Sequence, residues 1–327
     1  MNFELNEEQQ AILESIERLL DQHAGPARAV ELNRDNSYDH NLHALLDSSG
    51  FSWVARDLAS GPGSGKDLAG LEAALIVEAI ARAGGVVTSA AQMLVAPGVS
   101  QENIAGPIAL ATTADLTKPV PLRFAAHAKK LLVLGDDDVY LIALAEGDFE
   151  AVRSSFGYPM GRAVASPRWE HPASEGQSLG ANKASTMRNW WRLSLAIEAV
   201  GTMEAALNNT VEYLKQRRQF GRAIGSFQAV QHRLSLCAIH VEASRWLARE
   251  AAHQGAPEEA VAAAAAFALH AADQVFTETH QMSGAIGFTH EFNLHVWSMR
   301  LLALRQELDG VGGARRALVQ ARWGKTA

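Results

Sequence analysis

The residues best suited to do chemistry gather in one short stretch, residues 213–228, which read YLKQRRQFGRAIGSFQ. Four cations, two phenylalanines and a glycine directly after the first phenylalanine fall within it. Guanidinium groups bind phosphate oxygens through paired hydrogen bonds, and aromatic rings pack on flat surfaces. The glycine lets the backbone approach a ligand closely. The stretch predicts a site for a flat, anionic molecule, and a solvated cationic helix end is the simpler alternative for these residues taken alone.

The composition limits the class of protein. The chain has 327 residues, of which 48% are hydrophobic and 20% charged, so it can bury a substantial core. Its formal net charge of −7 argues against a general nucleic-acid binder. The single cysteine, Cys237, excludes an internal disulfide and a cysteine-based zinc site, and its helical setting predicts a small buried side chain.

The sequence carries no pattern typical of export or of a membrane span. The N-terminal segment MNFELNEEQQ is acidic and lacks the apolar stretch of a secretory signal. Residues 260–269 form the most apolar run, but they are mostly alanine and have acidic residues on both sides. We therefore expect a cytoplasmic protein without a membrane span.

The elements that must position the cationic stretch divide the chain into three parts. Residues 1–105 predict a helical domain, which begins with a capping box at Asn6 and Gln9. Residues 106–183 contain short apolar runs between turn residues and predict a small, trimmed β domain. Residues 184–327 return to helical periodicity and predict a C-terminal four-helix bundle, whose last helix covers about 293–307. The predicted fold class is mainly α with a small β domain.

Two local patterns resemble ligand loops but fit simpler interpretations. Residues 60–66, SGPGSGK, are glycine-rich but lack the full pattern of a phosphate-binding loop, so we interpret them as a linker. Asp136, Asp137 and Asp138 lack the spacing of a calcium loop and predict the tip of a β-hairpin. The C-terminal histidines do not share the i, i+4 spacing of a metal-binding pair, so the sequence predicts no metal site.

The order of these parts, together with three segments, resembles the acyl-CoA dehydrogenase family. The likeness is strongest over residues 196–234, which contain EAVGTMEAALNNTVEYLKQRRQFGRAIGSFQAVQHRL, and it extends to HQMSGAIGFTHEFNLHVWSMR at residues 280–300. The N-terminal FELNEEQQAILESIERLL is similar to the family's first helix, whereas the β domain matches poorly. The resemblance implies an FAD-dependent enzyme that oxidises an acyl-CoA substrate and passes electrons to a separate acceptor.

The resemblance also assigns the opening stretch. In the family, the arginine and phenylalanine of an Arg-x-x-Phe-Gly motif contact the FAD of a neighbouring subunit, and they correspond to Arg217 and Phe220. Further positions resemble those that line the adenosine side or close over the dinucleotide. They are Gln219, Ile224, Phe227 and Val230 for the adenosine side, and Gln281 and Gly284 for the dinucleotide. Ala285 stands where the family has a second glycine.

The family removes the substrate's α proton with a carboxylate, and burial in an apolar pocket raises the pKa of such a base. At the family's spacing that position is Asp309, within RQELDGVGG, one methylene shorter than the usual glutamate. Glu307 is a weaker candidate, and a solvated helix end is an equally open alternative for both. Some members place the base on the first C-terminal helix, where this chain has Trp191. Glu198, farther along, is expected to be structural.

The β domain departs from the family pattern. Its segment ALATTADLTKP lacks the family's flavin-holding Thr-Glu-Pro stretch, and no tryptophan precedes Trp169 in this domain. The trimmed domain resembles that of short subunits in heteromeric acyl-CoA dehydrogenases of steroid-degrading bacteria, where two different chains share each FAD. The resemblance therefore implies a second acyl-CoA dehydrogenase subunit as partner, and the short domain leaves room for a bulky acyl group. A self-sufficient homo-oligomer with Asp309 as base and a non-catalytic partner subunit stay open as alternatives.

Overall fold

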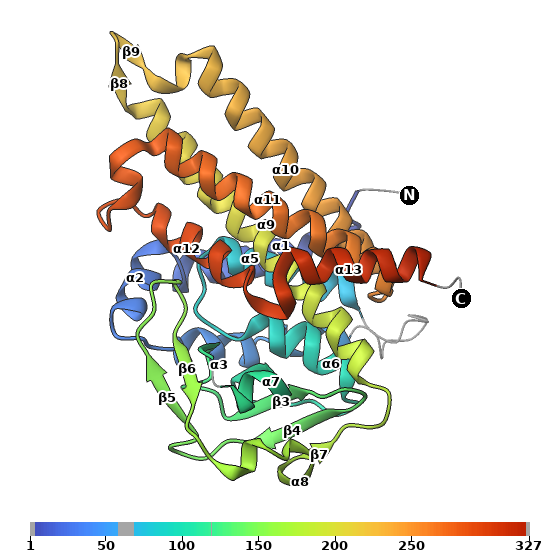
Figure 1. Cartoon of the computed structure of the whole chain (residues 1–327). Coiled ribbons are helices and arrows are strands. Elements are labelled where there is room, and N and C mark those ends of the chain that lie inside the picture. The colour runs from blue at the N-terminus through green and yellow to red at the C-terminus, as the bar shows by residue number, and fades with distance from the viewer. Residues whose placement is uncertain (1–3, 58–68, 119, 325–327) are drawn as a thin grey trace.

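The computed structural model describes residues 4–57, 69–118 and 120–324. Helices come first, a small β region follows, and long helices complete the chain (Figure 1). This arrangement confirms the predicted fold class, mainly α with a small β part. The linker predicted at residues 60–66 lies outside the described residues.

The N-terminal region is built from helices that local sequence signals start and stop. Asn6 Oδ1 accepts the Gln9 N–H at 2.8 Å and Gln9 Oε1 accepts the Asn6 N–H at 3.1 Å, so the predicted capping box is confirmed. The last long helix ends before Gly84, whose left-handed φ of 74° suits glycine. The elements are α1 (Glu7–His23), α2 (Pro26–Arg34), α3 (His40–Ser48), η1 (Phe51–Trp53), α4 (Val54–Asp57), α5 (Gly70–Arg82), the π turn η2 (Ala91–Val95) and α6 (Ala96–Val99).

The β region holds two small sheets. The first has the strand order β1-β3-β4-β7, in which only β1 and β3 are parallel, and the second has the order β2-β6-β5. The acidic triplet forms the hairpin tip between β3 and β4, as predicted, where the Gly135 N–H bonds to the Asp138 carbonyl at 2.9 Å. The elements are β1 (Ile108–Thr112), α7 (Thr113–Thr117), β2 (Leu122–Arg123), β3 (Lys130–Leu134), β4 (Val139–Ala143), β5 (Phe149–Val152), β6 (Met160–Ala163), η3 (Pro167–Trp169), α8 (Pro172–Glu175) and β7 (Gln177–Ser178).

Long helices form the C-terminal region, and a small hairpin caps one end of it (Figure 1). The predicted last helix over 293–307 is too long, because it ends at Leu304 and a further helix follows. Leu308, Asp309 and Gly310 all have positive φ, which turns the chain between the two helices. The elements are α9 (Ala184–Gln216), β8 (Arg218–Gln219), β9 (Arg222–Ala223), η4 (Ile224–Ser226), α10 (Gln228–His253), α11 (Glu258–Ser283), η5 (Gly284–Phe288), α12 (Leu294–Leu304), η6 (Glu307–Asp309) and α13 (Gly310–Trp323).

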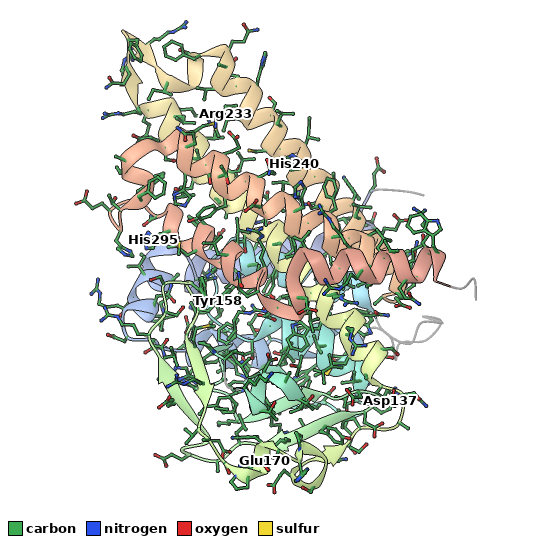
Figure 2. The ribbon with its side chains drawn as sticks, in the orientation of Figure 1. Asp137, Tyr158, Glu170, Arg233, His240 and His295 are labelled. Atoms are coloured by element: carbon green, nitrogen blue, oxygen red, sulfur yellow. The ribbon has the colours of Figure 1, made fainter. Side chains whose placement is uncertain are left out.

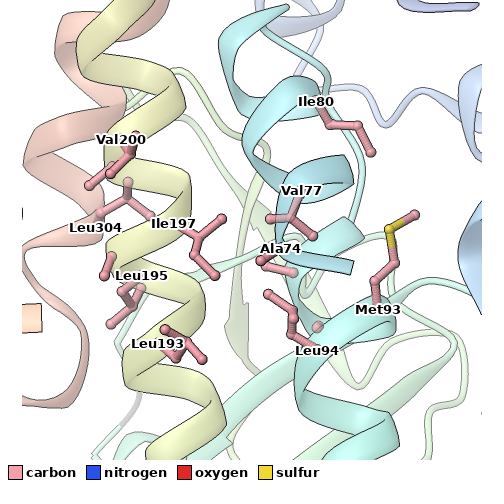
Figure 3. Close-up of a cluster of buried hydrophobic side chains, with 14 of the residues drawn as sticks. Ala74, Val77, Ile80, Met93, Leu94, Leu193, Leu195, Ile197, Val200 and Leu304 are labelled. Atoms are coloured by element: carbon pink, nitrogen blue, oxygen red, sulfur yellow. The ribbon is translucent and has the colours of Figure 1, made fainter. Parts of the chain in front are cut away.

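The main core joins the N-terminal and C-terminal helices along α9 (Figure 3). Gly201 lets α9 approach α5 closely, because a Cβ at this position would lie 2.2 Å from the Glu78 carbonyl oxygen. Apolar side chains of α9 then pack against those of α5, η2 and α12. They are Leu193, Leu195, Ile197 and Val200 against Ala74, Val77, Ile80, Met93, Leu94 and Leu304. This packing fixes α9, which also carries side chains of the candidate site.

The bundle contains the single cysteine of the chain and a long, apolar helix, α11. Cys237 on α10 is buried, as predicted, and burial raises the pKa of its thiol to about 11. The segment Glu258–Phe288 is long and apolar enough to cross a membrane by length and composition. Over its most apolar stretch, 56% is buried within the protein, where α11 packs against α9, α10 and α13. Such burial is typical of the core helix of a helical bundle.

Candidate active site

The predicted ligand residues lie in two separate places, and one helix connects them. The first is the end of the C-terminal helices that carries β8, β9 and η5, and we call residues 213–230 and 281–292 there the tip. The second is a pocket between the β region and the helices α9 and α12. Glu198 in the pocket and Arg217 at the tip are nineteen residues apart along α9, a rise of about 28 Å.

The hairpin of the tip begins where α9 ends. Arg217 follows the helix, and its N–H still bonds to the Tyr213 carbonyl at 2.8 Å. Phe220 (φ 53°) and Gly221 (φ 79°) then form a left-handed turn between β8 and β9. A left-handed phenylalanine is uncommon outside functional turns. This turn leaves the Phe220 residue 91% exposed, so the ring faces outward from its own chain.

The other predicted FAD residues of this segment lie on the same hairpin. They are Gln219 in β8, Ile224 in η4, Phe227 directly before α10 and Val230 in its first turn. The rings of Phe220 and Phe227 meet edge-on with centroids 6.1 Å apart. The Arg222 guanidinium lies 3.9 Å from the centroid of Phe227. The hairpin therefore offers a continuous surface of rings and cations.

The second predicted segment reaches the same tip. Gln281 is exposed at the end of α11, and Gly284 (φ 66°) begins η5 with open space around it. Tyr213 of α9 packs against Phe292 with ring centroids 5.1 Å apart, which joins the two segments. The structure thus brings the Arg217 and Gln281 segments together at one end of the molecule.

The charges of the tip are only partly paired. Lys215 pairs with Glu212 at 2.6 Å, but within the part of the chain that the structure describes Arg217 and Arg218 form no ion pair. Two unpaired guanidinium groups beside an exposed ring and an open glycine turn suit a pyrophosphate joined to a flat ring system. The residues at the tip therefore fit one face of FAD.

The pocket has a volume of about 500 Å³. Most of its wall is apolar and comes from residues 87–91 and from the β region. The main apolar lining residues are Val87, Ala90, Ala91, Ile108, Leu110, Phe124, Phe156 and Met160. Acidic side chains gather at the side formed by α9 and η6, where Glu198, Glu307 and Asp309 line the pocket. An apolar cavity with a few polar groups on one side suits an organic acyl group.

A buried ion cluster forms the acidic side of the pocket. Arg123 on β2 donates two hydrogen bonds to the Glu198 carboxylate, at 2.9 and 3.1 Å, and its Nε bonds to Glu307. Trp191 Nε1 donates to the other oxygen of Glu307 at 2.6 Å. Burial raises the pKa of the Glu198 carboxyl, although Arg123 opposes this shift. Glu198, expected to be structural and either paired or exposed, is paired and buried, and Glu307 is held on both oxygens.

Tyr158 packs against the cluster where the β region meets the C-terminal helices (Figure 2). The guanidinium groups of Arg123 and Arg300 lie 4.9 and 4.7 Å from its ring centroid. Burial raises the pKa of the Tyr158 hydroxyl to about 12, so it stays neutral at physiological pH. The cluster joins β2, α9 and η6 and fixes the shape of the pocket.

Asp309, the predicted base, lies at the edge of the pocket in the turn before α13. Its side chain is 77% exposed, and its Oδ2 accepts a hydrogen bond from Arg316 at 2.8 Å. The turn is tight, because a Cβ on Gly310 would lie 2.2 Å from the Arg305 carbonyl oxygen. Asp309 thus lines the pocket with one carboxylate oxygen bonded to Arg316, and its role as base stays a prediction.

Arg123, which organises the acidic side of the pocket, was not predicted as a site residue. A signal was present, because Arg123 is a lone cation within the apolar run PLRFAA. A charge in a short apolar strand must find a partner when it is buried. Its partners Glu198 and Glu307 are 75 and 184 residues away, too far for a local pattern to identify.

Comparison with known proteins agrees with this geometry. Residues 179–322 match the family model described as the acyl-CoA dehydrogenase C-terminal domain. The chain is 28% identical to the acyl-CoA dehydrogenase IpdE2 of Mycobacterium tuberculosis, over 97% of this chain and 98% of that protein.

Solved structures share the whole fold. Butyryl-CoA dehydrogenase from Megasphaera elsdenii superposes with a TM-score of 0.78 at 21% identity, covering 98% of this chain and 99% of that one. A chain of the ChsE4-ChsE5 complex from Mycobacterium tuberculosis gives 0.75 at 20% identity and covers 100% of both chains. A chain of the Tcur3481-Tcur3483 steroid ACAD gives 0.73 at 22% identity, covering 95% of this chain and 96% of that one.

A helical region, a small β region and a helical bundle with a pocket between them define the acyl-CoA dehydrogenase fold. The family model over the bundle and the full-length similarity to IpdE2 add sequence evidence to that fold. Residues 179–322 match the family's C-terminal domain, and the whole chain is similar to acyl-CoA dehydrogenases in sequence and in fold.

Proposed function

We propose that this protein carries out FAD-dependent α,β-dehydrogenation of an acyl-CoA thioester as one subunit of a heteromeric enzyme whose chains share FAD at their interface. The observation that carries the proposal is the separation of tip and pocket within one chain. Glu198 and Arg217 are nineteen residues apart along a single continuous helix, a rise of about 28 Å. The tip therefore suits the flavin that another chain binds. The pocket suits an acyl group in a site that another chain's tip completes.

In this proposal each group of residues has a defined task. Bound FAD supplies the acceptor for the hydride that leaves the β carbon of the substrate. Arg217 binds the pyrophosphate, and Phe220 packs against the flat part of the neighbouring chain's cofactor. The pocket wall excludes water from the acyl group, and Asp309 accepts the α proton after its contact with Arg316 opens. The Arg123 cluster holds the turn beside Asp309, because Glu307 is fixed on both carboxylate oxygens.

The volume and lining of the pocket support a bulky, apolar acyl group. A cavity of about 500 Å³ falls within the usual range for organic ligands. The similar Tcur3481-Tcur3483 protein is named a steroid ACAD, and the similar ChsE4-ChsE5 protein is a complex of two different chains. Both names support a ring-bearing, steroid-derived acyl-CoA as substrate and a second acyl-CoA dehydrogenase subunit as partner. A separate protein then accepts the electrons.

Two other arrangements use the same surfaces. Identical chains could complete one another, because each chain carries both a tip and a pocket, which gives a self-sufficient homo-oligomer. The exposure of Asp309 and its contact with Arg316 favour a different alternative, in which the partner supplies the base and this chain is a non-catalytic half-site donor. The three arrangements differ in whether the chain alone or the complex binds flavin, and in whether an acyl-CoA reduces that flavin.

Purification with and without a partner distinguishes them. We expect bound flavin only when the chain is co-expressed with a homologous acyl-CoA dehydrogenase subunit, with bleaching of the flavin absorbance after addition of a ring-bearing acyl-CoA. Flavin in the chain purified alone would favour the homo-oligomer. A flavin-loaded complex that no acyl-CoA reduces would contradict the proposed reaction.

A further inference from the structure

A row of polar side chains lies behind the pocket wall in the N-terminal region, and no step of the proposed reaction uses it. Tyr38 is buried, and its hydroxyl lies 2.8 Å from His43 Nδ1. His43 Nε2 lies 3.4 Å from Asp47, whose other oxygen accepts a hydrogen bond from Gln92 at 3.0 Å. At the opposite end, the Tyr38 hydroxyl accepts the Thr88 N–H at 3.2 Å. Thr88 itself lines the pocket.

The partners fix the direction of these bonds. The Asp47 carboxylate lies 3.4 Å from His43 Nε2, and its negative charge favours the ring proton on that nitrogen. Burial lowers the pKa of His43, which favours the neutral ring with an accepting Nδ1. The Tyr38 hydroxyl therefore donates to Nδ1, and its oxygen is left as an acceptor toward Thr88. Tyr38 thus holds the Thr88 backbone N–H, and His43, with Asp47 beside it, orients the Tyr38 hydroxyl.

The hydroxyl hydrogen of Thr88 is not firmly bound by the protein. Its Oγ1 accepts the Ile108 N–H at 3.3 Å, which uses one lone pair. The acceptor that the structure offers its hydrogen is the Tyr38 oxygen, also at 3.3 Å. That distance is well beyond the usual O–H···O length of about 2.7–2.8 Å. The hydroxyl can thus rotate toward a better acceptor in the pocket at little cost.

Three other side chains that line the pocket already donate to carboxylates. Thr112 Oγ1 donates to Asp115 at 2.8 Å within a capping box. The Arg123 nitrogens all bond to carboxylates, and Trp191 bonds to Glu307. Around Thr88 the wall is apolar, with neighbours such as Val87 and Leu110. A single loosely held hydroxyl in an apolar wall is suited to one specific polar contact.

We propose that Thr88, positioned by Tyr38, His43 and Asp47, is a specificity-determining residue that donates a hydrogen bond to a carbonyl oxygen on the acyl group, away from the thioester. The inference rests on the proposed function, because it assumes that the pocket holds an acyl-CoA. It adds a chemical class, namely an acyl group that carries a ketone on its ring or chain. A desolvated ketone without a donor would lose its hydrogen bonds to water, so the contact selects for its presence.

The test compares matched ligands on the co-purified, flavin-loaded complex. The probes are 3-cyclohexylpropanoyl-CoA and its 2-, 3- and 4-oxocyclohexyl counterparts, and the measurement is the Kd of each by calorimetry. We expect at least one oxo ligand to bind more tightly than the hydrocarbon. Thr88→Val, which keeps the shape of the side chain, should reduce that preference about tenfold. Thr112→Val is the matched control, and it should keep the wild-type ratio of the affinities.

Tyr38→Phe provides a second variant, because it keeps the ring and removes the hydroxyl that holds Thr88. We expect a smaller reduction of the same preference. The inference is overturned if the wild-type complex prefers none of the oxo ligands, or if Thr88→Val weakens all ligands equally. Absence of binding by every acyl-CoA would overturn the proposed function and this inference together, whereas hydrocarbon binding without selectivity overturns only the inference.

Discussion

The tip and the pocket treat their arginines in opposite ways. In the pocket, Arg123 has a carboxylate for each of its nitrogens, and the side chain is 9% exposed. At the tip, Arg217 and Arg218 form no ion pair within the described residues, and Phe220 beside them is 91% exposed. The cation of the pocket is fully paired within the chain, whereas the cations of the tip are open.

The difference separates charged groups that are satisfied within this chain from charged groups that are open to a ligand or a partner. A buried guanidinium must be paired within its own chain, because an isolated buried charge is strongly unfavourable. Exposed rings and unpaired cations carry no such requirement, yet they cluster at the tip with the second segment, where Phe288 is 74% exposed. Surfaces of this kind mark binding sites. The paired pocket cluster keeps its shape, and under the proposed function the open tip holds a ligand between chains.

The largest expected effect comes from breaking the closed region. Arg123→Leu would leave the carboxylates of Glu198 and Glu307 buried without their cation. We expect the free energy of unfolding to fall by about 3–5 kcal/mol in urea denaturation. Arg316→Leu removes the exposed pair with Asp309 and should cost no more than about 1 kcal/mol. Equal costs for the two variants would contradict a tightly paired pocket.

A second variant tests whether the pocket does chemistry. Asp309→Asn keeps the shape of the side chain and removes its ability to accept a proton. We expect flavin to stay bound in the complex and its reduction by acyl-CoA in stopped flow to slow by a factor of about 10². Asp309→Glu should keep activity. Reduction at the wild-type rate in Asp309→Asn would assign the base to the partner chain.

The open region responds differently to the loss of a charge. Arg217→Ala removes a charge-assisted contact to pyrophosphate, which is worth about 1.5–3 kcal/mol, or roughly tenfold to a hundredfold in FAD affinity. The melting temperature of the flavin-free chain should hardly change, because this side chain has no ion pair within the described residues. Arg233→Ala, which pairs with Glu278, is the control and should keep FAD affinity. Unchanged flavin content in Arg217→Ala would contradict the role of the tip.

The smallest effect concerns His280, which lies directly before the tip at the end of α11. It is buried between Phe276 and Phe288, and burial lowers its pKa. Among the residues that the structure describes, neither ring nitrogen has a hydrogen-bond partner. Below the ordinary histidine pKa of about 6.5, the unfolded chain takes up a proton that the folded chain does not. Stability therefore falls as pH decreases through this range.

His280→Leu should make that decrease shallower in thermal melts between neutral and mildly acidic pH. His43 and His295 also have pKa values lowered by burial, so part of the decrease should remain. The exposed His270→Leu serves as control. A pH dependence of the melting temperature identical to wild type would show that His280 is protonated in the folded chain.

Local sequence signals predicted the elements whose physics is local. The capping box at Asn6 and the acidic hairpin tip between β3 and β4 each depend on residues within a few positions of one another. The last helix was mispredicted for the same reason. The segment DGVGGARR reads as glycine-rich, yet α13 begins at Gly310, and Gly313 is required because a Cβ there would lie 2.2 Å from the Leu308 carbonyl oxygen.

The candidate site divides along the same line. The tip residues follow one another in two short motifs, so the family resemblance identified them. The Arg123 cluster depends on contacts between distant elements. The same is true of the contact between Tyr38 and Thr88, which are 50 residues apart in the sequence. Tertiary packing determines such contacts, and no periodicity or motif records them.

The central claim is that flavin bound by the tip belongs to another chain. Size-exclusion chromatography with in-line light scattering and flavin absorbance tests it directly, because mass and cofactor are read in the same peak. The account predicts that flavin elutes only with particles of two or more chains, and that Arg217→Ala removes flavin from them. A peak with the mass of one chain that carries one flavin would contradict the account.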